Sequence, residues 1–384
     1  MNGAKGILII FHTPTNAGYA MTALEKMFFN VCCAITKDPL KVHFAFSEVS
    51  AGSPKSLPED FCRYIKIDGR DNGTFDSAKN YIGQNNIKNV LCFDVQPRAL
   101  LCDFLRSCGV EKIVSYWGST ISSENNAFKL FLKKIDVFFS FSKPDLFIFE
   151  SEAMRHLAVN GRGILNRNTV VIPTGVDIER FKPDVDAFGF VRSIFGIPLD
   201  AKIIFYSGHM EERKGVKVII DAAIYLSEKC PAHNLYFLIC GNRPGEQNRF
   251  IEALSGTAAE KKVIFGGYRN DLPQIMPGCS LGVVASTGWD SFPMSTLEMA
   301  ASGLPIVVSR LQGLVETLED GKTGFTFESG NPKDLAEKIL QIMSDEKLQS
   351  YMSLNACERI RRGFTLKNQF DSLFQALSKV YGDS

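Results

Sequence analysis

Two cationic residues, Arg213 and Lys214, stand between a glycine-containing loop and a segment with helical periodicity. The loop begins at Gly208, directly after an apolar run, and glycine lets a backbone approach a ligand closely. Because the N-terminus of a helix is itself electropositive, two cations beside it favour an anion, and a diphosphate is the natural occupant. A solvated loop with ordinary surface charges is the alternative that these residues leave open.

A second polar group surrounds the predicted start of another helix, near Ser295. Asp290 precedes this helix and Glu298 lies in it, so two carboxylates could accept hydrogen bonds from ligand hydroxyls. The backbone N–H groups that could face a phosphate there belong to Met294, Ser295 and Thr296. Ser295 and Glu298 also have the spacing of a capping box, so helix capping is a competing role for Glu298.

The loop after the first predicted strand is a weaker candidate. It carries His12 at its start and Gly18 directly before a predicted helix. The loop lacks the residue spacing of the dinucleotide-binding and Walker motifs, so a plain strand-to-helix connection competes with phosphate binding.

The elements that must position these residues follow from the hydrophobic pattern. In the first half of the chain, short apolar runs alternate with helix-period segments such as 20–36. The predicted strands of this half are 6–11, 41–46, 89–93, 112–116, 136–140 and 169–172. Apolar strands alternating with helices predict an α/β fold with a doubly wound parallel sheet, covered by helices on both faces.

The same alternation restarts after a polar stretch, 180–198, which we interpret as a linker. The predicted strands that follow are 202–206, 235–240, 262–265, 281–285 and 305–309, with a helix over 216–226. We expect Rossmann-like domains over 1–183 and 184–363, and a tail over 364–384 that packs back on the first domain. The tail helix has an apolar face, predicted to be buried, formed by Phe370, Leu373, Phe374, Leu377 and Val380.

Charge and composition argue against several classes of protein. The chain has 384 residues, with 43 Lys and Arg against 42 Asp and Glu, and this balance argues against a nucleic-acid partner. No apolar run has transmembrane length and no signal-peptide core is present, so a cytoplasmic protein is expected. The ten Cys form no CxxC pair and no Cys/His cluster, which predicts reduced thiols and no metal site.

Taken in order, these motifs resemble those of the retaining glycosyltransferases of the GT-B fold, the group of bacterial mannosyltransferases and sucrose and glycogen synthases. The central matches are Gly208…Arg213-Lys214-Gly215 and Asp290-x7-Glu298-Met-Ala-Ala-Ser-Gly-Leu-Pro. The supporting matches are Val171–Asp177, Phe181, Pro183, Cys240-Gly241, Phe265–Tyr268 and Asp320–Phe325. The resemblance implies two Rossmann-like domains that face a cleft.

The resemblance also implies roles for individual residues. Arg213 and Lys214 would neutralise the donor diphosphate, Asp290 would contact the transferred sugar, and Glu298 would hold the nucleotide ribose. Gly18 would approach the diphosphate from the first domain. The residues at the family's base-contact positions are Tyr268, Arg269 and Asn270. Breaking an anomeric C–O bond places charge on the departing phosphate, which fixed cations and a helix end stabilise, so no metal or other cofactor is expected.

The sequence departs from the family pattern at two places. The family has Glu where this chain has the shorter Asp290, which bears on sugar geometry and donor identity. The family often has a His near the reacting sugar, where this chain has Trp117 and Gly118. Trp117 would either pack on a sugar face or belong to the core, and His12 is a further candidate for a polar contact on the sugar side.

A basic-aromatic segment precedes the middle of the chain. Its lysines are Lys129, Lys133 and Lys134, and its apolar residues include Phe128, Phe131, Leu132 and Phe138. A helix of this kind can lie on an anionic membrane surface. The competing interpretation, favoured at this point, is a helix packed on the core with solvated lysines.

We therefore expect an enzyme that transfers a sugar from a UDP- or GDP-sugar to a glycan, lipid-linked or small-molecule acceptor, with retention and without metal. A nucleotide-sugar epimerase, a phosphorylase and an inactive sugar-nucleotide-binding module are the alternatives. The expected partners are the donor and the acceptor, with peripheral contact to the cytoplasmic membrane face left open. The sequence predicts no oligomeric state.

Overall fold

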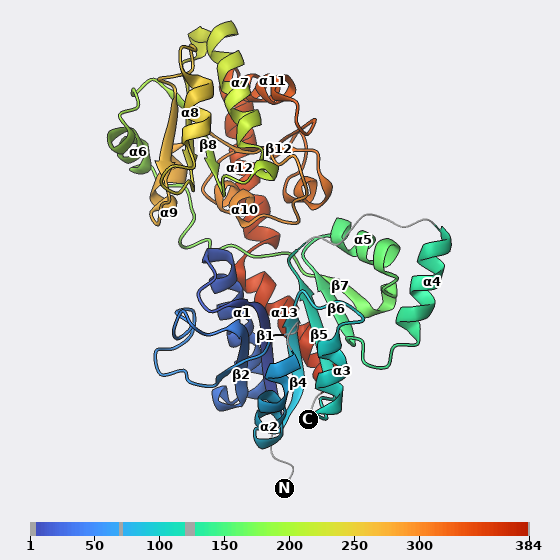
Figure 1. Cartoon of the computed structure of the whole chain (residues 1–384). Coiled ribbons are helices and arrows are strands. Elements are labelled where there is room, and N and C mark those ends of the chain that lie inside the picture. Colours follow the sequence, from blue (N-terminus) through green and yellow to red (C-terminus); the bar gives the residue numbers. More distant parts are fainter. Residues whose placement is uncertain (1–4, 69–71, 120–126, 383–384) are drawn as a thin grey trace. The chain divides into compact units, whose positions relative to one another are not determined.

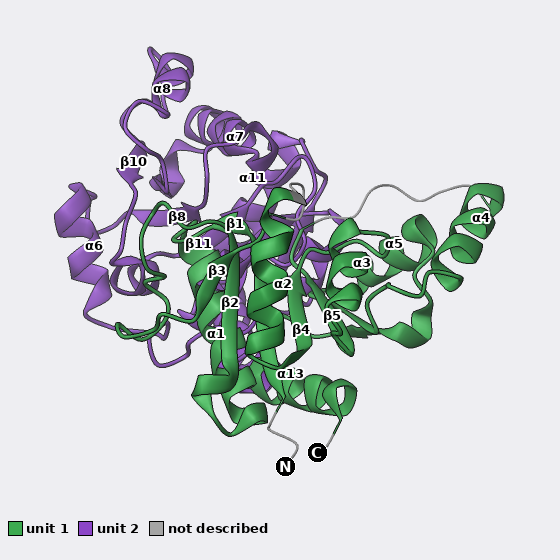
Figure 2. Ribbon diagram, turned by 60° about the horizontal axis from the view of Figure 1, so that its bottom comes forward, with its two compact units in different colours: residues 1–173, 369–384 green, residues 174–368 purple. Residues whose placement is uncertain are grey.

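The computed structural model describes residues 5–68, 72–119 and 127–382. The chain forms two compact units (Figure 1; Figure 2): unit 1 is residues 1–173 with 369–384, and unit 2 is residues 174–368. Each unit has its own parallel sheet with helices packed on it, so the predicted pair of doubly wound α/β domains is confirmed.

Unit 1 is built on a sheet whose strand order, over the described residues, is β3-β2-β1-β4-β5-β6-β7. The strands are β1 (Gly6–Pro14), β2 (Val42–Glu48), β3 (Tyr64–Lys66), β4 (Ile87–Phe93), β5 (Lys112–Trp117), β6 (Leu146–Phe149) and β7 (Thr169–Val171). The helices are α1 (Tyr19–Thr36), α2 (Phe75–Gln84), α3 (Leu100–Ser107), α4 (Ala127–Phe138), α5 (Glu152–Arg162) and α13 (Leu366–Tyr381). The order of the strands reverses between β1 and β4, which makes this pair the switch point of unit 1.

The core of unit 1 lies on both faces of its sheet. Along β1, Ile7 and Ile9 belong to one buried cluster, whereas Leu8 and Ile10 belong to another, as the two-residue period of a strand requires. The C-terminal helix α13 contributes to the first cluster through Leu373, Leu377 and Tyr381, and the Tyr381 hydroxyl donates to the Val90 carbonyl at 3.0 Å. Phe374, which was also predicted to be buried on the apolar face of α13, is 38% exposed and lies at the margin of that face.

Unit 2 repeats the architecture with the strand order β10-β9-β8-β11-β12-β13 within the described residues. Its strands are β8 (Lys202–Ser207), β9 (Leu235–Cys240), β10 (Val263–Gly267), β11 (Leu281–Val284), β12 (Ile306–Ser309) and β13 (Gly324–Phe327). Its helices are α6 (Ala187–Phe195), α7 (Val216–Lys229), α8 (Asn248–Leu254), α9 (Leu272–Ile275), α10 (Met294–Ala301), α11 (Pro332–Met343) and α12 (Glu346–Gly363). The order reverses between β8 and β11, and this pair is the switch point of unit 2.

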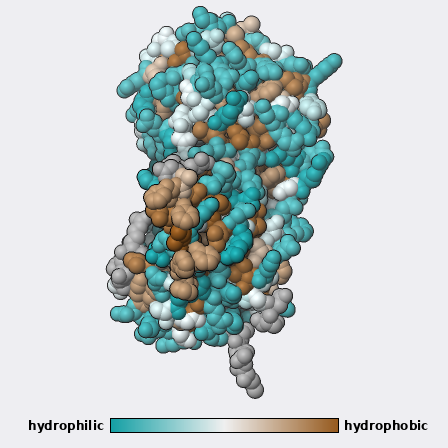
Figure 3. All heavy atoms as spheres, turned by 90° about the vertical axis from the view of Figure 1, so that its right-hand side faces the viewer, coloured by the Kyte–Doolittle hydropathy of each residue, from teal (hydrophilic) through white to brown (hydrophobic). Residues whose placement is uncertain are grey.

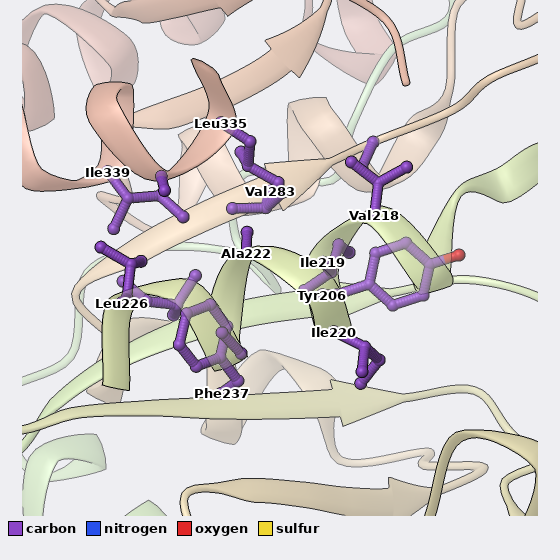
Figure 4. Close-up of a cluster of buried hydrophobic side chains, with 14 of the residues drawn as sticks. Tyr206, Val218, Ile219, Ile220, Ala222, Leu226, Phe237, Val283, Leu335 and Ile339 are labelled. Carbon is purple, nitrogen blue, oxygen red and sulfur yellow. The ribbon is translucent and has the colours of Figure 1, made fainter. Parts of the chain in front are cut away.

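Helix α7 is fixed on the sheet of unit 2 by a continuous apolar stripe. Ile219, Ala222 and Leu226 recur at three- and four-residue spacing and are buried. Figure 4 shows this stripe close to side chains from two strands and from α11, namely Phe237, Val283, Leu335 and Ile339. Because a fully buried Leu or Ile side chain stabilises by about 1.5–3 kcal/mol, the stripe anchors α7 and therefore also the loop before it.

The structure corrects one predicted strand. Residues 136–140 are not extended, because they contain the last turn of α4 and the turn after it, and the strand β6 begins only at Leu146. A short apolar run such as Val137-Phe138-Phe139 cannot be assigned to strand or helix from periodicity alone. The short strands β3 and β13 also had no predicted counterpart.

The stretch 180–198 lies inside unit 2 and does not form a linker. Phe181, Val191 and Ile197 are buried in a core cluster of this unit, and residues 187–195 form α6. The polar residues around Pro183 had suggested a connection, whereas the apolar residues between them anchor the segment. The division between the units falls after residue 173, where the sequence suggested 183.

Helix α4 is not packed on the core through its aromatic residues. Phe128, Phe131 and Phe138 are exposed, and Val137 is the buried residue of this helix. The core-packed interpretation is therefore wrong, because the helical spacing shows that an apolar face exists but does not say what covers it. No helix in the described parts of the chain is both long and apolar enough to cross a bilayer.

Candidate donor site of unit 2

The loops that follow β8 and β11 meet at the switch point of unit 2. The backbone N–H of Thr287 donates to the Arg213 carbonyl at 2.8 Å. Gly215, with φ of +69°, turns the chain into α7, and a Cβ atom there would lie 1.7 Å from the Ala285 carbonyl oxygen. Residue 215 must therefore be glycine, and its close approach holds the cationic loop against the β11 loop.

An ion pair between Lys214 and Asp290 forms the polar centre of this region. Lys214 Nζ donates to Asp290 Oδ2 at 2.9 Å, and the two side chains are 17% and 7% exposed. The Ser286 hydroxyl donates to the same oxygen at 2.8 Å. Both hydrogen bonds that the described residues make to this carboxylate end on Oδ2, so Oδ1 can still accept one from a ligand hydroxyl.

Arg213 is held by contacts of its own. Its Nε donates to Glu211 Oε2 at 2.7 Å, and its guanidinium lies over the Trp289 ring, 4.4 Å from the centroid. Both predicted cations thus have a carboxylate partner, and a bound diphosphate would share or displace Glu211. Glu211, Ser286 and Trp289 were not predicted as site residues, although Trp289 stands beside Asp290 in the motif.

Tyr206 explains why Gly208 is a glycine. The buried Tyr206 hydroxyl donates to the His209 carbonyl at 2.8 Å, and a Cβ atom on Gly208 would lie 2.6 Å from the phenol oxygen. Burial, reinforced by the charge of Asp290, raises the pKa of Tyr206 far above its usual range, so the phenol stays protonated. The side chain therefore supports the loop as a neutral hydrogen-bond donor.

The capping interpretation of Glu298 is wrong. Helix α10 begins after Pro293, which occupies the N-cap position, so Ser295 lies inside the first turn and cannot start a capping box. Glu298 is 4% exposed in the middle of the helix. The N–H of Thr296, one of the three groups predicted to face a phosphate, donates to the Pro293 carbonyl at 3.2 Å.

The predicted base-contact residues follow β10, on the edge where all parallel strands of this sheet end. Tyr268 is 66% exposed, so its ring is available for stacking. Arg269 Nε donates to Asp271 Oδ1 at 2.7 Å, and this hydrogen bond lowers the pKa of the Asp271 carboxyl. The structure thus brings Arg213, Lys214 and Asp290 together and places Tyr268 and Arg269 farther along the same edge.

The remaining predicted residues lie in unit 1. His12 is in β1, and Gly18, with φ of +129°, is the N-cap of α1 at the switch point of that unit. Trp117 is 3% exposed and packs beside Phe149, with ring centroids 6.2 Å apart. Its burial favours the core alternative over stacking on a sugar.

An unpredicted carboxylate, Asp94, follows β4 at the same switch point. Its Oδ1 accepts hydrogen bonds from the backbone N–H groups of Gly118 at 3.0 Å and Ser119 at 3.2 Å. Burial raises the pKa of the Asp94 carboxyl, and the two hydrogen bonds lower it by a smaller amount. No sequence motif marks this residue, because its partners belong to a different loop.

The described ranges contain no group of three or more His, Cys, Asp or Glu side chains arranged to hold a metal ion. Metal independence stays a prediction, which an activity measurement with a chelator tests.

Comparison with known proteins matches one family and several relatives. Residues 189–359 match the family described as Glycosyl transferases group 1. The D-inositol 3-phosphate glycosyltransferase of Corynebacterium urealyticum is 30% identical over 199 residues, 50% of this chain and 47% of that protein. The UDP-Gal:alpha-D-GlcNAc-diphosphoundecaprenol alpha-1,3-galactosyltransferase of Escherichia coli is 23% identical over 252 residues, 66% of this chain and 64% of that protein. The chain thus spans about half to two thirds of the length of these relatives.

A solved structure extends the likeness of fold over both units taken together. The crystal structure of Anabaena Alr3699/HepE in complex with UDP has a TM-score of 0.77 at 19% sequence identity. It covers 97% of this chain and 100% of that chain. At this identity the likeness concerns the fold.

Proposed function

From a chain that has the GT-B fold and carries a glycosyl transferases group 1 domain over residues 189–359, we propose a glycosyltransferase that uses a nucleotide diphosphate sugar. One observation carries the proposal. The ion pair of Lys214 and Asp290 joins the two loops at the switch point of unit 2, directly before the N-terminus of α7. This combination offers a cation for a diphosphate and a carboxylate for sugar hydroxyls within one hydrogen-bond distance of each other.

The proposed chemistry concerns the leaving group. When the anomeric C–O bond breaks, negative charge grows on the departing diphosphate. Lys214 can keep its hydrogen bond to Asp290 and donate another to a phosphate oxygen, because an ammonium group has three donors. Arg213 and the α7 N-terminus add positive potential, and because they are already fixed, they need little reorganisation when the charge develops.

The same proposal gives the other residues binding roles. Asp290 Oδ1 accepts a hydrogen bond from a hydroxyl of the transferred sugar, and the Glu298 carboxylate accepts hydrogen bonds from the ribose hydroxyls of the nucleotide. Tyr268 and Arg269 contact the base. Retention of configuration and independence of metal follow from the family resemblance and belong to the proposal.

The donor is proposed to be a UDP- or GDP-sugar, and the likeness to a protein crystallised with UDP supports the former. The acceptor is a glycan, a lipid-linked or a small molecule. The name of the Escherichia coli relative includes a diphosphoundecaprenol acceptor, which supports a lipid-linked one. Such an acceptor would bring the chain to the cytoplasmic membrane face as a peripheral protein.

The test combines binding and turnover with the full chain. Thermal unfolding is followed with UDP, GDP and their sugars, because a selective ligand stabilises the folded state. Transfer is then measured with the stabilising donor, with and without EDTA, and the anomeric configuration of the product is read by NMR. Donor-dependent transfer that Lys214→Ala nearly abolishes supports the proposal.

The alternatives give different products in the same assay. An epimerase converts the donor without any acceptor, and a phosphorylase requires inorganic phosphate. An inactive module binds the donor and gives no product with any acceptor. Any of these three outcomes would contradict the proposed transferase activity. Unchanged turnover in a folded Lys214→Ala variant would overturn the proposed role of the ion pair.

A further inference from the structure

Helix α4 turns its apolar residues toward solvent. The exposed residues are Phe128 (71%), Phe131 (60%), Leu132 (49%), Ile135 (40%) and Phe138 (52%), followed by Phe139 (64%) and Phe141 (95%). Those of the helix are spaced by three or four residues, so they form one stripe along it. In Figure 3 a brown patch lies on the side of the molecule on which Figure 1 draws α4.

The opposite side of α4 is held against unit 1. Val137 is buried, and Lys133 Nζ donates to the Gly161 carbonyl at 2.9 Å. A Cβ atom on Gly163, at the end of α5, would lie 2.8 Å from the Lys133 carbonyl carbon, so the backbones of the two segments touch. These contacts orient the helix, and the outward direction of the stripe follows from them.

Basic residues border the stripe on both sides. At 100° per residue, Lys129 falls beyond one margin of the stripe and Lys134 beyond the other. The acidic residue of this helix, Asp136, pairs with Arg98 at 3.3 Å, which compensates its charge. An apolar stripe between lysines has the composition of helices that lie in the interface of an anionic bilayer.

We propose that residues 128–141 form a docking surface for an anionic lipid bilayer, with α4 lying parallel to the membrane. The aromatic rings enter the region between headgroups and acyl chains, and the lysines contact the headgroup phosphates. We favour a bilayer over a second protein because of charge. An extended anionic surface can contact the lysines on both margins of the stripe at the same time. The surface lies outside the donor site, so the proposal does not depend on the transferase activity.

The test is co-sedimentation of the full chain with vesicles, in the absence of donor. The chain is expected to bind vesicles of equimolar phosphatidylglycerol and phosphatidylcholine at least about tenfold more strongly than phosphatidylcholine alone, and more weakly in high salt. The Phe131→Ser/Phe138→Ser variant loses at least about tenfold of the binding. Lys129→Glu/Lys134→Glu loses a similar factor on anionic vesicles only.

Matched substitutions in unit 2 provide the control. Leu199→Ser/Leu354→Ser removes two apolar side chains that are more exposed than Phe131 and Phe138, at 72% and 73%, and leaves vesicle binding unchanged. Circular dichroism confirms that all variants are folded, as expected for exposed side chains. Vesicle binding that is absent, or equal in the Phe variant and the control, overturns the proposal. So does a dimer that the Phe variant dissociates, since the stripe would then cover a second copy.

Discussion

The two units share one architecture but fill their switch points differently. At the switch point of unit 2, a cation and a carboxylate from different loops meet, Lys214 with Asp290, at 2.9 Å. At the switch point of unit 1, the carboxylate of Asp94 instead binds backbone N–H groups, those of Gly118 and Ser119. In unit 2, the ammonium and carboxylate groups can also form hydrogen bonds to a charged ligand. In unit 1, the carboxylate holds one loop against another.

The difference indicates a division of labour. The family match covers residues 189–359, which lie within unit 2, so the proposed donor site lies in the part of the chain that the family shares. Unit 1 carries features that lie outside the family match, among them Asp94 and the exposed stripe of α4. We therefore expect substitutions at the unit 2 switch point to weaken donor binding or transfer, and substitution of Asp94 in unit 1 to leave donor affinity unchanged.

The largest effect is expected from Lys214→Ala. Loss of a fixed cation at the leaving group should lower kcat by about 10²–10³-fold, the range seen when one preorganised donor is removed. Steady-state transfer measures it, with Lys217→Ala as the control, because Lys217 lies in the first turn of α7, its side chain is 74% exposed and it pairs with Asp221. A similar loss in Asp94→Asn would erase the contrast between the switch points.

Glu298→Gln tests a buried residue of the same site. Glu298 is 4% exposed in α10, and the amide should weaken nucleotide binding by about tenfold, because it accepts ribose hydroxyls less well than a carboxylate. Calorimetry with the nucleotide gives the affinity, and thermal unfolding gives the stability. If the variant binds normally but unfolds at much lower temperature, the carboxylate serves the fold of α10 and not the ligand.

Much of the fold could be predicted because buried parallel strands are continuous apolar runs. The strand 235–240 was predicted with the bounds that β9 has, and most others differ by one or two residues. The failures have a common cause, the ambiguity of short apolar runs. The strands β3, β6 and β13 have three or four residues, and the apolar end of α4 was predicted as a strand because periodicity alone does not assign so short a run to strand or helix.

The grouping of the candidate site residues could be predicted in part from local sequence. Arg213, Lys214 and Asp290 were expected from loops that follow strands, and parallel strands bring such loops to one edge. Glu211 and Trp289 were missed, because their role depends on where the Arg213 side chain lies. Trp117 shows the opposite limit, since an aromatic residue at a strand end has the same sequence signature whether it faces a sugar or the core.

A smaller effect is expected from Trp289→Leu, which removes the ring beneath Arg213. A cation–π contact of this exposure contributes about 0.5–1 kcal/mol, so KM for the donor should rise by roughly two- to fivefold with little change in kcat. Trp289→Phe keeps an aromatic face and should recover most of the loss. Equal effects of the two substitutions would show that Arg213 is positioned by Glu211 instead.

The smallest effect, of opposite sign, is expected from Asp94→Asn in unit 1. Burial raises the pKa of Asp94, so between the unfolded and the folded pKa the folded chain holds a proton that the unfolded chain has lost. Above the folded pKa, the charged carboxyl therefore lowers the free energy of unfolding, and this penalty disappears as the pH falls below the unfolded pKa.

Asparagine keeps an Oδ1 acceptor for the N–H groups of Gly118 and Ser119, and it tolerates the φ of +57° at this position. Asp94→Asn should raise the midpoint of thermal unfolding at pH 7 by no more than a few degrees, since about 1 kcal/mol shifts it by about 2–4 °C in a unit of this size. The difference from the unmodified chain should shrink at pH 4, with donor affinity the same at pH 7. A lower midpoint at pH 7, or transfer lost at normal stability, would mean that unit 1 uses the charge of Asp94. The two switch points would then differ in the ligand that each binds, and Asp94 would not serve only to hold two loops together.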